Sequence, residues 1–154
     1  MEKKIFTFIL LIFLSSCGYE AIYSAKNIKN NTFSISKLSF IGDREINLKI
    51  KQKLNNYTKE IKDINFILKI TSTSEKIILA KDTAGDSANF KIETIVNIDV
   101  FNEEKLKSNF IITESFNYDN NSNKFELKNY EKEIKRNLAD IITEKLIFKL
   151  ANIK

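Results

Sequence analysis

The stretch KIETIVNIDV, residues 91–100, alternates apolar and polar side chains almost without a break. One set of alternate positions carries Ile92, Thr94, Val96, Ile98 and Val100, and the other carries Lys91, Glu93, Asn97 and Asp99. A period of two residues is typical of a β-strand that buries one face and exposes the other. The stretch therefore predicts an antiparallel sheet that is covered on a single side.

Strands are predicted on both sides of this stretch. Residues 64–71 alternate in the same way, and after the polar residues 72–76 the apolar positions resume in the same parity, which fits one long strand or two shorter ones. Turns are predicted at 82–87 and 102–105. The last strand should bury Phe110, Ile112, Phe116 and Tyr118. Glu114 interrupts that face, so it lies at a sheet edge or is hydrogen-bonded, and we favour the edge.

The segment before this sheet predicts a strand and a helix. Apolar residues alternate over 32–41 with one phase slip, which indicates a bulge, and Gly42 ends the pattern. Asp43 is placed to cap a helix of roughly 43–60. Its apolar stripe consists of Ile46, Ile50, Leu54, Tyr57 and Ile61.

A long C-terminal helix is predicted after the polar loop 119–123. Asn123 and Glu126 have the spacing of a capping box, with Asn in place of Ser or Thr. A helix of about 26 residues would be about 39 Å long. Its apolar stripe consists of Leu127, Tyr130, Ile134, Leu138, Ile141, Ile142, Leu146 and Leu150.

These elements predict an α+β fold in the order β-α-β-β-β-α. Two striped helices and a sheet with one apolar face fit a two-layer sandwich, in which a sheet of about four strands is covered on one face by both helices. The last three strands should form an antiparallel meander. The first strand would pair with the second in parallel if the two are neighbours. We expect residues 32–154 to form a single domain.

The N-terminus has a different composition. Lys3 and Lys4 precede an apolar run at 5–14, two serines follow, and Cys17 is the only cysteine in the chain. A basic head, an apolar centre and small residues are typical of a secretory signal peptide. The alternatives are a buried core segment, which has no reason to follow two lysines at a terminus, and a membrane span. Ten apolar residues cover only about 15 Å as a helix, half of a bilayer core.

The sequence Leu14-Ser15-Ser16-Cys17 resembles the lipobox of bacterial lipoproteins. The resemblance implies cleavage between Ser16 and Cys17, a diacylglycerol thioether on the Cys17 sulfur, and a third acyl chain on the new amino group. Residues 1–16 would then be the signal peptide, and residues 17–31 the lipidated N-terminus and tether. We expect no cofactor apart from this covalent lipid.

Composition argues against several classes of function. The chain has no His, which excludes any Ser-His or Cys-His nucleophile pair, and an acylated Cys17 removes the other common zinc ligand. Glu103 and Glu104 are adjacent acids, but they fall in a predicted turn. The formal charge of +5 comes from scattered lysines without interleaved stacking aromatics, which is not the pattern of a nucleic-acid binder. We expect a protein that is not an enzyme, whose basic surface could attract anionic lipids or phosphorylated glycolipids.

Residues 14–23, LSSCGYEAIY, are similar to the Cys-Gly-aromatic-x-Pro-Leu-Tyr opening of the LPS-assembly lipoprotein LptE family, in particular its alphaproteobacterial branch. Ala21 stands where that pattern has Pro, and Ile22 where it has Leu. The order of elements and the C-terminal helix are similar as well, so the resemblance covers essentially the whole mature chain.

The resemblance implies a non-enzymatic lipoprotein at the periplasmic face of the outer membrane. Such a protein would plug an LptD-like β-barrel, assist its assembly and help to deliver lipopolysaccharide to the outer leaflet. Gly18 fits outer-membrane delivery, because Asp at that position is the usual retention signal for the inner membrane. The exposed ends of strands offer candidate contacts for anionic glycolipid: Lys76, Lys81, Lys105, Lys107 and Lys124. The alternatives are an unrelated outer-membrane lipoprotein that acts as a binding module, for a lipid transporter or the cell envelope, and a lipid-anchored enzyme that uses carboxylates.

Overall fold

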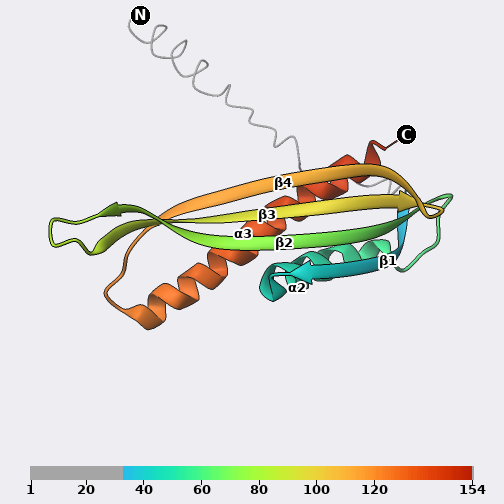
Figure 1. The fold of residues 1–154 in the computed structure, drawn as a ribbon. Helices are drawn as coiled ribbons and strands as arrows, with labels where there is room; N and C mark the ends of the chain where they lie inside the picture. The colour runs from blue at the N-terminus through green and yellow to red at the C-terminus, as the bar shows by residue number, and fades with distance from the viewer. Residues whose placement is uncertain (1–32, 154) are drawn as a thin grey trace, which may run out of the picture.

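A computed structural model describes residues 33–153, which form an elongated four-stranded sheet with two helices on one face (Figure 1). None of the helices described in this range has the length and apolar character needed to span a membrane. The elements, in chain order, are β1 Phe33–Gly42, α2 Arg44–Leu54, the short 3₁₀ helix η2 Asn55–Tyr57, β2 Ile64–Lys81, β3 Ser87–Asn102, β4 Lys105–Asp119 and α3 Lys124–Ala151.

The strands lie in the order β1-β2-β3-β4. β1 pairs with β2 in parallel, and the other two pairs are antiparallel, which confirms the predicted α+β arrangement. β2 is one continuous strand, so the long-strand alternative was right. We call the end with Phe33 and the 102–105 turn the base, and the end with the 82–86 turn the tip (Figure 1).

β1 carries the predicted bulge, seen as a register shift between Ile35 and Lys37. Asp43 caps α2 as predicted, because one carboxylate oxygen accepts hydrogen bonds from the amides of Glu45 and Ile46. The predicted extent of this helix was wrong. α2 ends at Leu54 and Ile61 is 92% exposed, since the chain turns away at two adjacent asparagines, which are poor helix formers.

The C-terminal helix α3 matches its prediction closely. The Asn123 side chain accepts hydrogen bonds from the amides of Phe125 and Glu126. The reciprocal half of the capping box is absent among the described residues, because Asn121 accepts from the Asn123 amide and its own side chain donates to Glu126. Asn121 thus bonds both the Asn123 amide and the Glu126 carboxylate, the two groups that would meet each other in a capping box.

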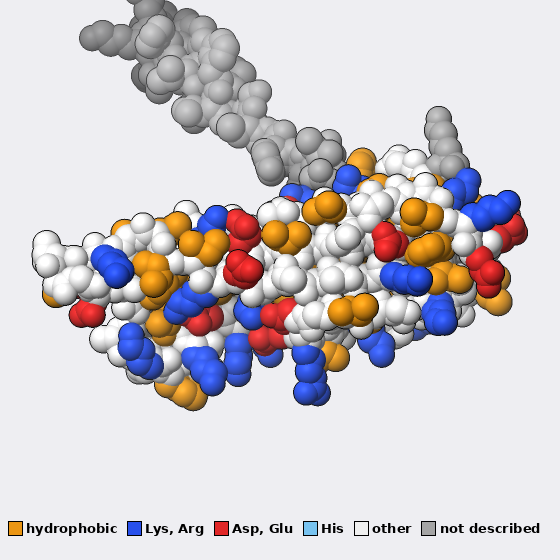
Figure 2. Space-filling view, viewed as in Figure 1, with side chains coloured by type: hydrophobic (Ala, Val, Ile, Leu, Met, Phe, Trp, Pro, Cys, Tyr) orange, Lys and Arg blue, Asp and Glu red, His pale blue; other side chains and the backbone are white. Residues whose placement is uncertain are grey.

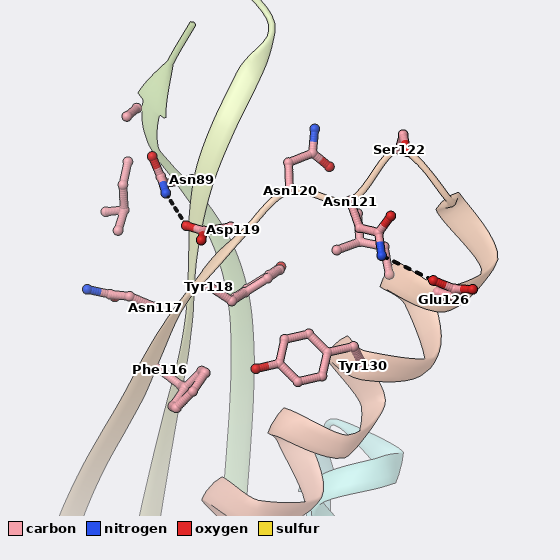
Figure 3. Close-up of a pocket in the computed structure, with 13 residues that line it drawn as sticks. Asn89, Phe116, Asn117, Tyr118, Asp119, Asn120, Asn121, Ser122, Glu126 and Tyr130 are labelled. Atoms are coloured by element: carbon pink, nitrogen blue, oxygen red, sulfur yellow. Dashed lines mark hydrogen bonds between the residues drawn. The ribbon is translucent and has the colours of Figure 1, made fainter.

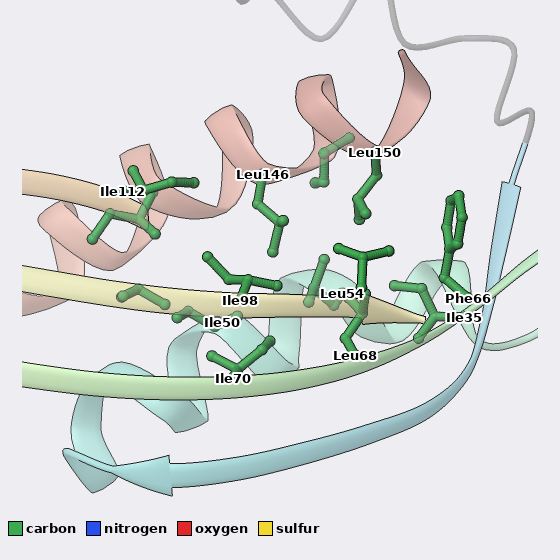
Figure 4. Packing of buried hydrophobic residues seen from close by; sticks show 14 of the residues in the cluster. Ile35, Ile50, Leu54, Phe66, Leu68, Ile70, Ile98, Ile112, Leu146 and Leu150 are labelled. Carbon is green, nitrogen blue, oxygen red and sulfur yellow. The ribbon is translucent and has the colours of Figure 1, made fainter. Parts of the chain in front are cut away.

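Most apolar side chains of the inner sheet face pack under both helices at the base. We call this cluster the main core (Figure 4). Leu68 and Ile98 from the sheet and Ile50 and Leu146 from the helices are each fully buried. Burying a side chain of this size contributes about 1.5–3 kcal/mol. This cluster therefore provides most of the hydrophobic stabilisation.

A second and smaller cluster lies toward the tip. We call it the small core, and its members are Phe90, Ile92, Tyr118, Leu127, Ile134 and Leu138. Three polar cross-strand neighbours separate it from the main core, namely Ser74, Thr94 and Glu114. Thr94 is fully buried and donates to the Ser74 hydroxyl at 3.4 Å, and Glu114 pairs with Lys145 of α3. Glu114 thus combines the two predicted alternatives, because it lies on an edge strand and is also hydrogen-bonded.

Candidate functional site

The structure places those predicted site residues that it describes in two separate regions. Ser16 and Cys17 lie outside the described residues, so the predicted cleavage and lipidation stay predictions. Lys76, Lys81 and Lys124 lie toward the tip, whereas Lys105 and Lys107 lie near the base. The five candidate lysines therefore do not form a single anion-binding cluster.

Lys76 is the one candidate lysine with strong internal contacts. Its ammonium group lies 2.6 Å from the Glu131 carboxylate and 3.7 Å from the centre of the Phe90 ring. Glu131 also accepts a hydrogen bond from the Tyr118 hydroxyl at 2.8 Å. These contacts hold the end of β2 against α3, and they satisfy the charge that a glycolipid phosphate would otherwise neutralise.

This network shifts the pKa values of Glu131 and Tyr118. Partial burial by itself would raise the pKa of Glu131, but the hydrogen bonds from Lys76 and Tyr118 and the charges of Lys76 and Lys135 outweigh it, so the pKa lies below its usual value. Burial, together with the hydrogen bond to Glu131, raises the pKa of the Tyr118 phenol. Glu131 therefore stays ionised and Tyr118 protonated near neutral pH.

The other candidate lysines are also exposed, and none of them has an ion pair among the described residues. Lys124 begins α3, and its ammonium group lies 3.5 Å from the Asn120 side-chain oxygen. Lys81 ends β2, and Lys105 begins β4 next to the turn that contains Glu103 and Glu104. Both glutamates are exposed and have positive φ angles of 48° and 67°, as expected for the predicted tight hairpin.

The outer face of the sheet is predominantly polar, as the sequence predicted for residues 91–99. Lys91 pairs with Glu93 at 2.7 Å, and the Asn109 amide donates to Asn97 and Asp99 at 2.7 Å each. Figure 2 shows charged and hydrophobic side chains interspersed on the side of the molecule where the sheet lies in front of α3. No large apolar surface gathers in this view.

A groove of about 1070 Å³ lies at the tip (Figure 3). We call it the tip groove. It is bounded by residues 79–80 of β2, Asn89 of β3, residues 116–119 of β4, the loop 120–122 and the first two turns of α3. The Tyr130 ring projects from α3 toward β4, where Phe116 and Tyr118 lie (Figure 3). The volume is that of a site for a small ligand.

Hydrogen bonds fix the polar rim of the tip groove. The Asn120 side-chain amide donates to the Ser87 carbonyl at 2.8 Å, and its backbone amide donates to Ala88 at 2.8 Å. Asn121 donates to Glu126 at 3.2 Å, and Asn89 donates to Asp119 (Figure 3). The loop is therefore tied to both β3 and α3.

The sequence did not identify the tip groove. Phe116 and Tyr130 fit the inner-face and helix-stripe patterns and were predicted to be buried, but they are 46% and 44% exposed. The one available signal was the density of amide and carboxylate residues at 117–123, which we interpreted only as a loop. Within residues 33–153 no three His, Cys, Asp or Glu side chains gather as metal ligands would.

No protein-family model and no curated protein matches the chain. Solved structures do match. The crystal structure of rare lipoprotein B from Shewanella oneidensis aligns with a TM-score of 0.56 at 17% identity, over 75% of this chain and 97% of that one. A minor lipoprotein from Acinetobacter baumannii aligns with a TM-score of 0.56 at 12% identity, over 75% and 90% of the two chains. The chain thus shares its fold with bacterial lipoproteins.

Proposed function

We propose that the chain is an outer-membrane lipoprotein, anchored through Cys17, that acts as a plug and assembly partner of an LptD-like β-barrel in lipopolysaccharide transport. The observation that carries the proposal is the shared fold with two bacterial lipoproteins, joined to the lipobox-like Leu14-Ser15-Ser16-Cys17 ahead of it. The similarity of residues 14–23 to the opening of the LptE family selects this role among those of lipoproteins.

Two features of the domain support an adaptor role. The outer sheet face offers paired charges and amides, which suit contact with the polar interior of a barrel. The candidate lysines at the base, Lys105 and Lys107, are exposed and free to approach anionic groups. Direct contact of the five candidate lysines with glycolipid phosphate stays a prediction.

Affinity purification from membranes tests the partnership. The full chain with a C-terminal tag should be purified from outer membranes in mild detergent, and a large β-barrel protein should co-purify with it in comparable amount. A Cys17→Ala variant should remain an unprocessed precursor that takes up no labelled palmitate. An eluate without any such barrel would overturn the assignment, and would leave the unrelated cell-envelope binding module as the alternative.

Photo-crosslinking tests which face meets the barrel. A photoreactive phenylalanine analogue at Thr113, exposed on the outer sheet face, should crosslink to the barrel in vivo. The same analogue at Lys132, exposed on α3, is the matched control and should crosslink much less. Crosslinking from Lys132 without crosslinking from Thr113 would show that the sheet face is not the contact surface.

A further inference from the structure

We propose that the tip groove binds a neutral pyranose oligosaccharide, through stacking on its two exposed aromatic rings and hydrogen bonds from its amide and carboxylate rim. The inference goes beyond the proposed function, because it depends only on the groove and not on a barrel partner. The groove wraps around the tip end of the edge strand β4, so its rings come from the inner sheet face and Asn89, Asn117 and Asp119 come from the outer face.

The aromatic part of the groove consists of Phe116 and Tyr130. Phe116 pairs across the sheet with Ile92, which is 2% exposed, and yet Phe116 itself is 46% exposed. Tyr130 is 44% exposed and its ring meets Tyr118 edge-on at 6.0 Å between centroids. Flat, supported rings that remain open to water suit the apolar C–H face of a sugar ring, since an aromatic side chain contributes large contact area at low entropic cost.

The polar part of the groove suits sugar hydroxyl groups. Planar side chains with both donors and acceptors can bind two neighbouring hydroxyls at once. Six of the residues that bound the groove carry an amide or a carboxylate: Asn89, Asn117, Asp119, Asn120, Asn121 and Glu126. Within residues 33–153, the Asn117 amide and the Tyr130 and Ser122 hydroxyls have no hydrogen-bond partner, so their donors are open to a ligand.

The groove is also held in place before any ligand arrives. Asn120 is anchored to β3 through Ser87 and Ala88, and Asn121 is anchored to Glu126 of α3. A rim that is already ordered loses less entropy on binding. This rigidity favours a site over an accidental hollow between loops.

The charge of the groove selects a neutral ligand. Among the described residues that bound it there is no lysine or arginine, whereas Asp119 and Glu126 are both present. Two basic groups lie beside it: Lys76 is paired with Glu131, and the Lys124 ammonium group lies 3.5 Å from the Asn120 side-chain oxygen at the rim. A phosphate would therefore meet two carboxylates against the single ammonium group of Lys124, whereas hydroxyl groups can donate to both acids.

The test uses the full lipidated chain in a detergent without a sugar headgroup, such as an amine oxide. Isothermal titration and amide NMR should be recorded with three probes: an N-acetylglucosamine tetrasaccharide, a neutral oligosaccharide from a lipopolysaccharide core that is free of phosphate and of acidic sugars, and inorganic phosphate. We expect at least one oligosaccharide to bind and to shift the side-chain amide signals of Asn117 and Asn121. The oligosaccharide that binds more tightly identifies the source of the glycan. Phosphate should leave these signals unchanged.

Matched variants separate the groove from the general surface. Tyr130→Ala should weaken oligosaccharide binding by at least about tenfold, whereas Phe125→Ala, an exposed ring on the same helix that does not bound the groove, should stay within about twofold. Asn117→Ala should weaken binding by about threefold to tenfold, with Asn129→Ala as its exposed control on α3. Circular dichroism confirms that each variant is folded.

Two results would overturn the inference. The first is the absence of any oligosaccharide binding to the folded wild-type chain, and the second is binding that survives unchanged in both Tyr130→Ala and Asn117→Ala. Co-purification of the barrel should be measured with the same variants. For the wild-type chain, co-purification of the barrel without oligosaccharide binding would refute the proposed sugar site alone. Oligosaccharide binding without co-purification of the barrel would refute the proposed function alone.

Discussion

The main core and the small core lie on the same face of one sheet, but they are covered differently. At the base, four strands lie beneath α2 and α3, and Leu68, Ile98 and Leu146 are fully buried. At the tip, three strands lie beneath α3 alone, because β1 ends where Gly42 pairs with Ser72. Beyond α2, the ammonium group of Lys76 lies over the Phe90 ring on the inner face of the sheet.

The difference explains why a groove exists at the tip only. A single helix cannot cover the full width of three strands, so an inner-face ring such as Phe116 remains half exposed. Polar residues across the middle of the sheet, with Thr94 at their centre, keep the two clusters apart. We infer that the base supplies stability and that the tip is free to carry a binding surface.

The two glycines of positive φ among the described residues, one at the end of β1 and one in the tip turn, provide the largest expected contrast. Gly42 has a φ of 101°, and an added Cβ would overlap the Ser72 carbonyl oxygen, whereas Gly85 has a φ of 90° with open space around it. Gly42→Ala should therefore lower the free energy of unfolding by at least about 4 kcal/mol. Gly85→Ala should cost only about 1–2 kcal/mol, from backbone strain. Urea denaturation measures both, and equal losses would contradict the contrast.

Truncation of one leucine in each cluster should give the next largest difference. Leu146→Ala in the main core is expected to cost about 3–5 kcal/mol, and Leu127→Ala in the small core about 2–3 kcal/mol. Both residues are leucines on α3, so the change in helix propensity is similar for the two substitutions and cancels in the comparison of their free energies. Thermal unfolding gives the two values. A larger loss of unfolding free energy for Leu127→Ala would show that the small core contributes more to stability than the main core.

Removal of the Lys76 ammonium group should loosen the tip specifically. Lys76→Met keeps the aliphatic stem but loses the ion pair with Glu131 and the contact with Phe90, at a cost of about 1–2 kcal/mol. Lys105→Met, at the exposed base turn, is the matched control and should change stability by less than about 0.5 kcal/mol. Hydrogen exchange should accelerate in residues 75–81 and 124–131 and stay unchanged at the base. Faster exchange at the base would contradict this local role.

Acid should weaken the tip by a smaller amount. The pKa of Glu131 is lower in the folded chain than the usual 4.5, so its contribution to stability is present above that pH and is lost as the pH falls through the folded value. Glu131→Gln should therefore flatten the decline in stability below about pH 4.5, by less than about 1 kcal/mol. Unfolding curves recorded from pH 7 to pH 3 measure the effect.

Asp43, at the start of α2, is a second carboxylate that pairs with α3, through Lys135. Burial by itself would raise the pKa of Asp43, but Lys135 and the α2 amides outweigh it, so this pKa is also lowered. Asp43→Asn keeps the cap and should flatten the acid decline in the same direction as Glu131→Gln. A decline that neither variant changes would show that other carboxylates cause it.

Local patterns predicted the sheet well because a period of two residues reports directly which side chains share a face. The bulge near Ile35 and the caps at Asp43 and Asn123 were also visible, since each depends on residues that lie close together in the chain. Where α2 ends was not visible from the stripe, which continued to Ile61 without a break.

The tip groove depends on information that periodicity does not contain. Phe116 and Tyr130 follow the apolar pattern correctly, and each does point toward the layer between sheet and helix (Figure 3). Whether that layer is filled depends on the path of α3 across the sheet and on the length of β1. Both are properties of the packed fold, and neither is encoded at any single position.

The parallel pairing of β1 with β2 puts the start of the described chain and the tip groove at opposite ends of the sheet. The described chain enters at the base, at Phe33 opposite Ile64, while the tip groove lies at the far end of β3. The 16 residues of β3 extend about 54 Å at the usual rise of an antiparallel strand. If Cys17 carries a lipid, the sheet acts as a spacer arm: it carries the groove about 50 Å from the point where the tether joins the domain.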